Sequence, residues 1–303
     1  MRPFSPATRR QPAVPHSGSS PGPGTGRPGS IGWIGGSLVT AFVLLGLAGP
    51  LMTPYHPTEL AGVPLSAPGR EHLLGTNSVG QDILAQLIAG TGVSLTVALL
   101  AGVGTIAIGA LVGLTAGWYG GRVDAVLMRI VDLFLMTPRL PLLIVIGAYV
   151  GPSLPVISLI IAITFWPMSA RVVRSQVLSL RQRAHVRAAV GFGARSTHVL
   201  GRHILPEVSL ILAAALVSAA GRAVTLEAGL AFLGLGDPSR VSWGRMLRDA
   251  MDFAALLQTD AWQWWLLPPV VAIALLLTGI TFVGVAVEQR INPRLARHRG
   301  SRR

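Results

Sequence analysis

The stretch Arg187-Ala188-Ala189-Val190-Gly191-Phe192-Gly193, continued by His203-Ile204-Leu205-Pro206, decides the fold of this chain. It belongs to a basic segment between two long apolar blocks, with seven arginines from Arg171 to Arg202 and no Asp or Glu. Positive charge between two apolar spans predicts a loop on the cytoplasmic side of a membrane. On a helix, Ala189 and Gly193 share one face beside Ala188, because they are four residues apart. That face lacks large side chains, so another protein's backbone can approach it closely.

The composition indicates an all-α polytopic membrane protein. Of the 303 residues, 51% are hydrophobic and 12% are charged, whereas soluble domains carry about 25% charged residues. The net charge is +13 and every basic residue is Arg. Without Lys there is no Walker A site, because that motif needs a Lys to reach the phosphates. Without Cys there are no disulfides or thiolate metal sites. The arginines alternate with apolar spans, which argues against nucleic acid as a partner.

Six transmembrane helices are expected, near residues 33–52, 94–118, 123–150, 154–173, 207–236 and 266–287. The predicted organisation is a disordered cytoplasmic tail (1–30), an uncleaved anchor helix (31–53), an extracytoplasmic segment (54–91), a five-helix core (92–288) with the basic loop at 181–206, and a basic cytoplasmic tail (289–303). This topology puts 19 of the 25 arginines inside, which agrees with the positive-inside rule. Both termini are therefore expected in the cytoplasm.

The third expected span carries three polar features. Pro138 is expected to kink it. Arg129 and Asp132 stand at i,i+3 spacing and can pair. Arg139 is costly in lipid and should face protein or water, so Arg139 and Arg222 are candidates for charges in a pore.

Three motifs resemble one family. Leu74-Gly75-Thr76-Asn77-Ser78-Val79-Gly80-Gln81-Asp82-Ile83-Leu84 resembles the Leu-Gly-Thr-Asp-x-x-Gly-Arg-Asp-x-Leu signature of dipeptide, oligopeptide and nickel permeases of ABC importers, with Asn77 and Gln81 as departures. Glu227-Ala228 with Phe232-Leu233-Gly234-Leu235-Gly236 and Ser242-Trp243-Gly244 resembles a second signature of that branch. The terminal Asn292-Pro293-Arg294-Leu295 resembles its Asp-Pro-Arg-Leu. Asp82, Glu227, Gly234, Gly236 and Trp243 are therefore candidates for the extracytoplasmic face or gate, although Asp82 also fits an ordinary acid at a helix start.

The opening stretch is similar to the EAA loop of these permeases. Ala188-Ala189, Gly193 and Leu205-Pro206 match its spacing, while Arg187 and His203 replace the family's Glu and Ile. The resemblance implies that Arg187, Ala188, Ala189, Gly193, His203, Leu205 and Pro206 belong to a helix that couples to a separate ATPase. A basic amphipathic helix lying on anionic lipid is the alternative interpretation.

The resemblance also implies an assembly and a fold. The chain would have the type I ABC importer permease fold, resemble the second of two permease subunits, and lie in the bacterial cytoplasmic membrane. Its partners would be a homologous permease, two cytoplasmic ATPases and an extracytoplasmic substrate-binding protein. The chain itself would bind no cofactor, since ATP and Mg would belong to the ATPases, and it would not be an enzyme.

Two other functions remain possible from the residues. An ion-coupled secondary transporter would use Asp132, Arg139, Arg222 and Glu227 as a relay, although no inverted repeat is visible. A membrane scaffold without transport is the second alternative. The seven His are scattered, so no metal site is expected. The sequence leaves the substrate open among dipeptides, oligopeptides, nickel chelates and related solutes.

Overall fold

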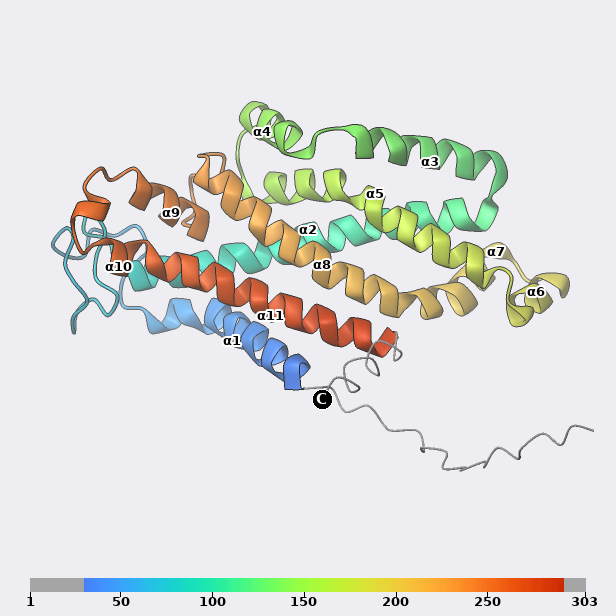
Figure 1. Ribbon diagram of the computed structural model, residues 1–303, viewed down its shortest axis with the longest axis horizontal. Coiled ribbons are helices and arrows are strands. Elements are labelled where there is room, and N and C mark those ends of the chain that lie inside the picture. Colours follow the sequence, from blue (N-terminus) through green and yellow to red (C-terminus); the bar gives the residue numbers. More distant parts are fainter. Residues whose placement is uncertain (1–29, 292–303) are drawn as a thin grey trace, which may run out of the picture.

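A computed structural model describes residues 30–291, and within that range the chain is helical without a β-strand (Figure 1). The elements are α1 (Ser30–Met52), α2 (Ile83–Tyr119), α3 (Gly121–Met136), α4 (Arg139–Val150), α5 (Leu154–Leu180), α6 (Ala184–Gly191), α7 (Ser196–Val199), the π-helix η1 (Leu200–Ile204), α8 (Leu205–Phe232), α9 (Trp243–Met251), the 3₁₀-helix η2 (Leu256–Gln258), α10 (Trp262–Trp265) and α11 (Leu267–Ile291). The predicted tails and the motif at Asn292–Leu295 lie largely outside the described residues.

Within that range, five helical segments are long and apolar enough to cross a membrane: Ser30–Gly49, Ile83–Tyr119, Leu154–Leu180, Ser196–Phe232 and Trp262–Arg290. A sixth span is present if α3 and α4 are counted together, but they meet at an angle of 85°. The all-α, polytopic architecture is thus confirmed. The expected single helix over 123–150 is wrong.

The break between α3 and α4 follows from Pro138. Thr137 ends α3 in an extended conformation (φ −74°, ψ 130°), and Pro138 precedes the first residue of α4. The proline ring disfavours helical geometry in the preceding residue, and proline cannot donate the hydrogen bond that would continue the helix. The proline therefore ends one helix and starts another, where the sequence analysis expected a kink.

The central helix α2 packs against α5, α8 and α1. Three of its glycines, four residues apart, face α5: a Cβ built on Gly109, Gly113 or Gly117 would stand 2.6–2.7 Å from atoms of residues 169, 170 or 177. Such contacts are too short for any side chain, so glycine is what allows the two helices to approach. This agrees with the close packing that small residues permit in membrane helices.

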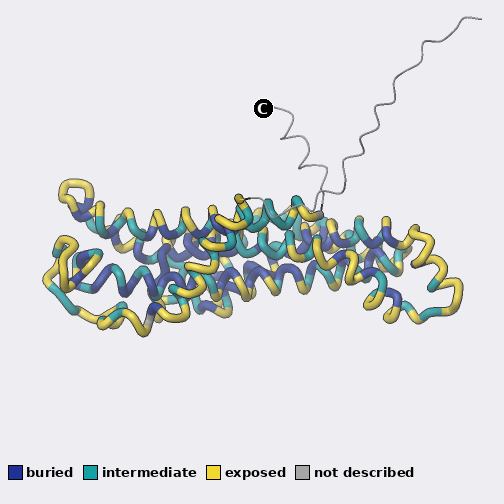
Figure 2. Tube along the Cα trace, turned by 90° about the horizontal axis from the view of Figure 1, so that it is seen from below, coloured by how far each residue is buried: buried dark blue, intermediate teal, exposed yellow. Residues whose placement is uncertain are grey.

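The two ends of the bundle carry different structures. Residues 181–206, here called the basic loop, contain α6, α7 and η1 and lie at one end (Figure 1). Residues 53–82 and 237–266, here called the cap, lie at the opposite end with α9 and α10. Buried residues follow the middle of the bundle, whereas exposed ones concentrate at its ends and on its outer faces (Figure 2).

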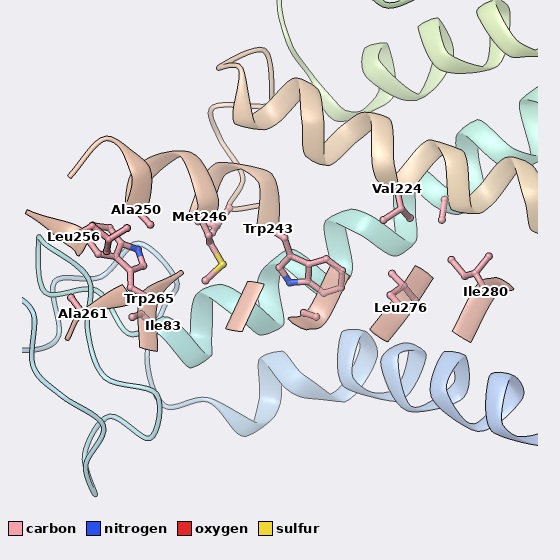
Figure 3. Packing of buried hydrophobic residues seen from close by; sticks show 13 residues of the cluster. Ile83, Val224, Trp243, Met246, Ala250, Leu256, Ala261, Trp265, Leu276 and Ile280 are labelled. Carbon is pink, nitrogen blue, oxygen red and sulfur yellow. The ribbon is translucent and has the colours of Figure 1, made fainter. Parts of the chain in front are cut away.

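The largest buried cluster attaches the cap to the bundle. Trp243, Met246 and Trp265 are each at most 1% exposed and pack with residues of α2, α8 and α11 (Figure 3). Burying side chains of this size contributes roughly 1.5–3 kcal/mol each. The cap is therefore part of the folded bundle.

Candidate functional site at the basic loop and cap

The helix α6 ends in a Schellman motif. The Gly193 N–H donates to the Val190 carbonyl at 2.9 Å, and the Ala194 N–H donates to the Ala189 carbonyl at 3.1 Å. Gly193 has φ +80°, a conformation that glycine adopts without steric cost. A Cβ at Gly193 would meet nothing within 4 Å. Within the described chain, the glycine is required by the turn and not by a neighbouring atom.

Gly193 lies beyond the end of α6, in the turn, so the expected helix face shared by Ala189 and Gly193 is wrong. The surface of α6 around Ala188 and Ala189 is nevertheless largely open. Arg187 and Ala188 are exposed and Ala189 is half-buried. Phe192 is 92% exposed, and sequence reasoning did not single it out. A large aromatic side chain presented beside small residues is a feature of surfaces that contact protein or membrane.

The basic loop is held against α8 by Glu207. This carboxylate accepts a hydrogen bond from the Arg183 guanidinium and lies 3.1 Å from His185 Nε2. The loop is also held in place by three buried side chains, those of Val186, Val199 and Ile204. Leu205 and Pro206 begin α8 directly after the π-helix η1, without a break in the helix: Ile204 has helical backbone angles, and the Leu205 N–H donates to the Leu200 carbonyl. Pro206 has no N–H to donate, and it therefore follows an irregular turn of a continuous helix.

Three of the histidines meet in this loop, which the sequence did not reveal. The His203 ring centroid lies 6.2 Å from that of His185 and 6.0 Å from that of His198. In the described part of the chain, no group of three His, Asp or Glu has an arrangement that could hold a metal ion. The cluster instead adds polar side chains beside Glu207.

Two ion pairs join α3 to α5. Arg174 makes a bidentate pair with Asp124, at 2.5 and 2.6 Å, and Arg171 contacts Asp132 at 2.5 Å. The predicted pair between Arg129 and Asp132 is therefore wrong, because Asp132 turns to the neighbouring helix. Two arginines of the basic segment thus pair with carboxylates of α3.

Asp82 is the N-cap of α2. Its Oδ1 accepts from the Ala85 N–H at 2.7 Å, and its Oδ2 lies 2.9 Å from His72 Nδ1. The side chain is buried with His72. Both carboxylate oxygens are thus engaged, as the helix-start interpretation of Asp82 anticipates. A role in a gate stays a prediction.

The two departures from the first signature contact each other. Asn77 Nδ2 donates to Gln81 Oε1 at 2.9 Å, and Asn77 Oδ1 accepts from the N–H groups of Val79 and Gln81. In the family pattern these positions hold Asp and Arg. A neutral amide pair thus stands where an ionic pair is expected.

The residues of the second signature lie in and around the buried junction of α8 and α9. Trp243 is fully buried and its Nε1 donates to the Leu87 carbonyl at 2.9 Å. Gly234, with φ +84°, ends α8 in a second Schellman motif, and Gly236 lies against Ala231. Glu227 is 3% exposed, and its Oε2 has no hydrogen-bond partner among the described residues. Trp243 is therefore placed to act through packing, and not by touching a soluble partner.

Phe165 is a neighbour of Arg139 and lines the same cavity as Arg222. The Arg139 guanidinium lies over the Phe165 ring, 5.0 Å from its centroid. Phe165 and Arg222 line one cavity between α8 and α11. The fold thus brings Arg139 and Arg222, 83 positions apart in the sequence, to one region of the bundle.

The fold and these sites define an integral membrane component with an exposed basic loop. Residues 109–297 match the family described as "Binding-protein-dependent transport system inner membrane component", and the chain belongs to that family. It is 37% identical over 259 residues to a "putative peptide permease protein" of Brucella suis, covering 85% of each chain. It is 33% identical over 265 residues to a "dipeptide transport system permease protein DppC" of Alkalihalophilus pseudofirmus, covering 86% of this chain and 85% of the relative. It is also 35% identical to a "putative peptide transport system permease protein" of Brucella suis, covering 86% and 87%.

Proposed function

We propose that this chain is a permease subunit of an ATP-driven importer for dipeptides or oligopeptides. It would form the translocation path with a homologous permease, receive substrate from an extracytoplasmic binding protein and couple to two cytoplasmic ATPases. The names of the relatives support the substrate class. The observation that carries the coupling role is the exposed, Schellman-terminated helix α6, which projects from the end of the bundle opposite the cap.

The proposed mechanism makes no covalent bond in this chain. ATP binding brings the ATPases together, and α6 passes that motion to α5 and α8, between which it lies in the sequence. The pairs of Arg183 and His185 with Glu207 tie the loop to α8, so that the loop and the helix move as one unit. The ATPases must bind the inward-open and outward-open states with different affinity, since otherwise nothing shifts the equilibrium.

The proposed orientation puts the basic loop and both termini in the cytoplasm, in the cytoplasmic membrane of a bacterium. The arginine distribution supports it. ATP and Mg would be bound by the ATPases, because this chain lacks the Lys of a P-loop. Nothing in this proposal requires a cofactor in the chain.

The alternative of an ion-coupled transporter has less support from the geometry. Asp132 pairs with Arg171, and Arg139 packs on Phe165. Between residues 30 and 291, no hydrogen bond joins any two of Asp132, Arg139, Arg222 and Glu227 into a relay.

Reconstitution tests the proposed function. Proteoliposomes holding both permeases and both ATPases, with the binding protein added outside, should accumulate a labelled di- or tripeptide only when ATP is present inside. Uptake should persist when an ionophore dissipates ion gradients. Uptake that stops with the ionophore, and continues with a hydrolysis-deficient ATPase, would contradict the proposal and favour the ion-coupled alternative.

A further inference from the structure

A cavity of about 670 Å³ lies between α8 and α11, with Phe165 of α5 in its lining. It is open to the surface of this chain, since Arg222, Thr281 and Glu288, which line it, are exposed. Its walls are mainly apolar, with hydroxyl groups from Ser218, Thr225 and Thr281. The two helices approach closely at glycines: a Cβ on Gly221 would stand 3.3 Å from Ile280 Cγ2, and one on Gly284 would stand 3.5 Å from Val217 Cγ1. These contacts fix the register of the antiparallel helices along the cavity.

One end of the cavity is positively charged. Arg222 lines it, and Arg139 lies over the ring of Phe165, which also lines the cavity. Neither arginine has an ion-pair partner among residues 30–291. Arg222 lies within the candidate span of α8. An arginine at the centre of such a helix costs about 2.5–3.5 kcal/mol on insertion scales and is normally kept for function. Arg139 is the first residue of α4, at the break after Pro138. Two such cations beside one cavity point to an anionic ligand.

The other end of the cavity is negatively charged. Glu288 lines it on α11, eight residues beyond Ile280, which packs beside Gly221. At 1.5 Å per residue, the Arg222 and Glu288 levels are about 12 Å apart along the helix axis. Side chains lean toward the N-terminus of their own helix. Because α8 and α11 are antiparallel, Arg222 and Glu288 lean toward each other.

We propose that this cavity is a subsite of the translocation path that holds a short peptide as a zwitterion. The C-terminal carboxylate binds Arg222 in the field of Arg139, and the N-terminal ammonium group points to Glu288. The guanidinium matches a carboxylate in a bidentate geometry. The distance of about 12 Å between the backbone levels of Arg222 and Glu288 corresponds to an extended peptide of about three residues, at 3.3–3.6 Å per residue. The volume lies within the roughly 300–1,000 Å³ of ligand sites. This inference rests on the proposed function, peptide import.

A thiol-protection experiment tests the subsite without depending on the binding protein. The chain has no cysteine, so Thr281→Cys in the assembled complex places a single thiol on this chain in the cavity wall. A free-acid tripeptide should protect that thiol from a maleimide at a concentration about tenfold lower than its C-terminal amide. Arg222→Gln should remove this difference, Arg222→Lys should restore part of it, and Arg240→Gln in the exposed cap should leave it unchanged. The N-acetylated peptide should lose protection by a similar factor, and Glu288→Gln should abolish that loss.

Peptide uptake in proteoliposomes separates this proposal from the proposed function. If the wild-type complex imports no peptide, peptide import itself is wrong. If it imports peptides and Arg222→Gln has unchanged kcat/KM and unchanged protection, only the subsite proposal is wrong. The subsite proposal is also wrong if Arg222→Gln lowers kcat/KM equally for the free acid and for the amide. In that case Arg222 does not bind the peptide carboxylate, and it pairs instead with an acid of the second permease.

Discussion

Asn77 donates a side-chain hydrogen bond to Gln81 across 2.9 Å, at the two positions where the first motif departs from its family pattern. Asn77 is 3% exposed, and Gln81 extends the network to the Thr58 carbonyl and to Gln86. Asn77 and Gln81 therefore depart from the family pattern together, because their amide pair stands where the pattern has Asp and Arg. The motif acts here as a structural turn before α2.

This pair predicts a coupled double-mutant cycle. Asn77→Asp places a carboxylate oxygen against Gln81 Oε1 and removes a buried hydrogen bond, which costs about 1–3 kcal/mol. Gln81→Arg alone leaves the guanidinium without an anion. The double variant recreates the ionic pair, so its melting temperature in detergent should be higher than the two single changes predict. Additive effects, with a coupling energy below about 0.5 kcal/mol, would contradict this interpretation.

Trp243 should behave as a core residue of the cap. Trp243→Ala leaves a cavity beside Gly90 and Phe42 and removes the bond to the Leu87 carbonyl. Such a truncation costs about 3–5 kcal/mol. Trp243→Phe keeps most of the packing and should cost much less. The measurement is the melting temperature together with the amount of protein in the membrane. A Trp243→Ala variant with normal stability and reduced uptake would instead indicate a direct contact with a partner.

Asp237 predicts a pH dependence of stability. Burial raises the pKa of its carboxyl, but hydrogen bonds from the Ser239 hydroxyl and from the Leu154 and Ser239 N–H groups outweigh it, so the pKa lies below the usual Asp value. A depressed pKa in the folded state stabilises the protein above the unfolded pKa of about 3.9. That contribution is lost as the pH falls through the folded pKa.

The measurement is the melting temperature between pH 6 and pH 3. Wild type should lose more stability over this window than Asp237→Asn, which cannot titrate. Asp260→Asn, a change at an exposed acid of the same cap, should follow wild type. Parallel curves for wild type and Asp237→Asn would show that the junction of the cap with α5 does not depend on this charge.

Much of the fold is readable from the sequence because a bilayer fixes span length and excludes charge. The apolar runs therefore located α1, α5, α8 and α11 closely. The start of α2, next to the cap, was harder to predict. This helix begins at Ile83, well before the expected start near Ser94, because Asp82 caps it. A proline such as Pro138 bends or ends a helix according to its packing, which no local pattern encodes. The partners Arg171 and Asp132, or His185 and His203, meet only through the tertiary register.

Topology can be read with single cysteines on the cysteine-free chain. Ala67 in the cap and Thr197 in the basic loop are both exposed. An impermeant thiol reagent applied to intact cells should label Ala67→Cys and not Thr197→Cys, because the basic loop is proposed to be cytoplasmic. Permeabilised cells should label both, which controls for access. Labelling of Thr197→Cys in intact cells would reverse the proposed orientation. Ser19→Cys and Ser301→Cys, outside the described residues, should also stay unlabelled.

Gly193 offers the sharpest test of the coupling helix, because its turn and its side-chain space can be separated. A non-glycine residue in the left-handed region costs about 1–2 kcal/mol, and Asn tolerates that region better than other residues. Gly193→Asn should therefore keep the Schellman turn and most ATPase coupling. Gly193→Leu should strain the turn and add bulk, lowering substrate-stimulated ATPase activity about tenfold while the protein remains in the membrane.

The measurements are co-purification of the ATPases and ATPase stimulation in proteoliposomes. Since a Cβ at Gly193 meets no atom of residues 30–291 within 4 Å, we expect any steric loss to come from a partner. If Gly193→Asn loses ATPase binding and stimulation as completely as Gly193→Leu, the site needs the absence of a side chain so that α6 fits an ATPase groove. The turn conformation is then of secondary importance. If Leu retains full binding and stimulation, the coupling assignment is wrong. The basic loop then lies on lipid, where an added Leu beside exposed Phe192 is neutral or favourable.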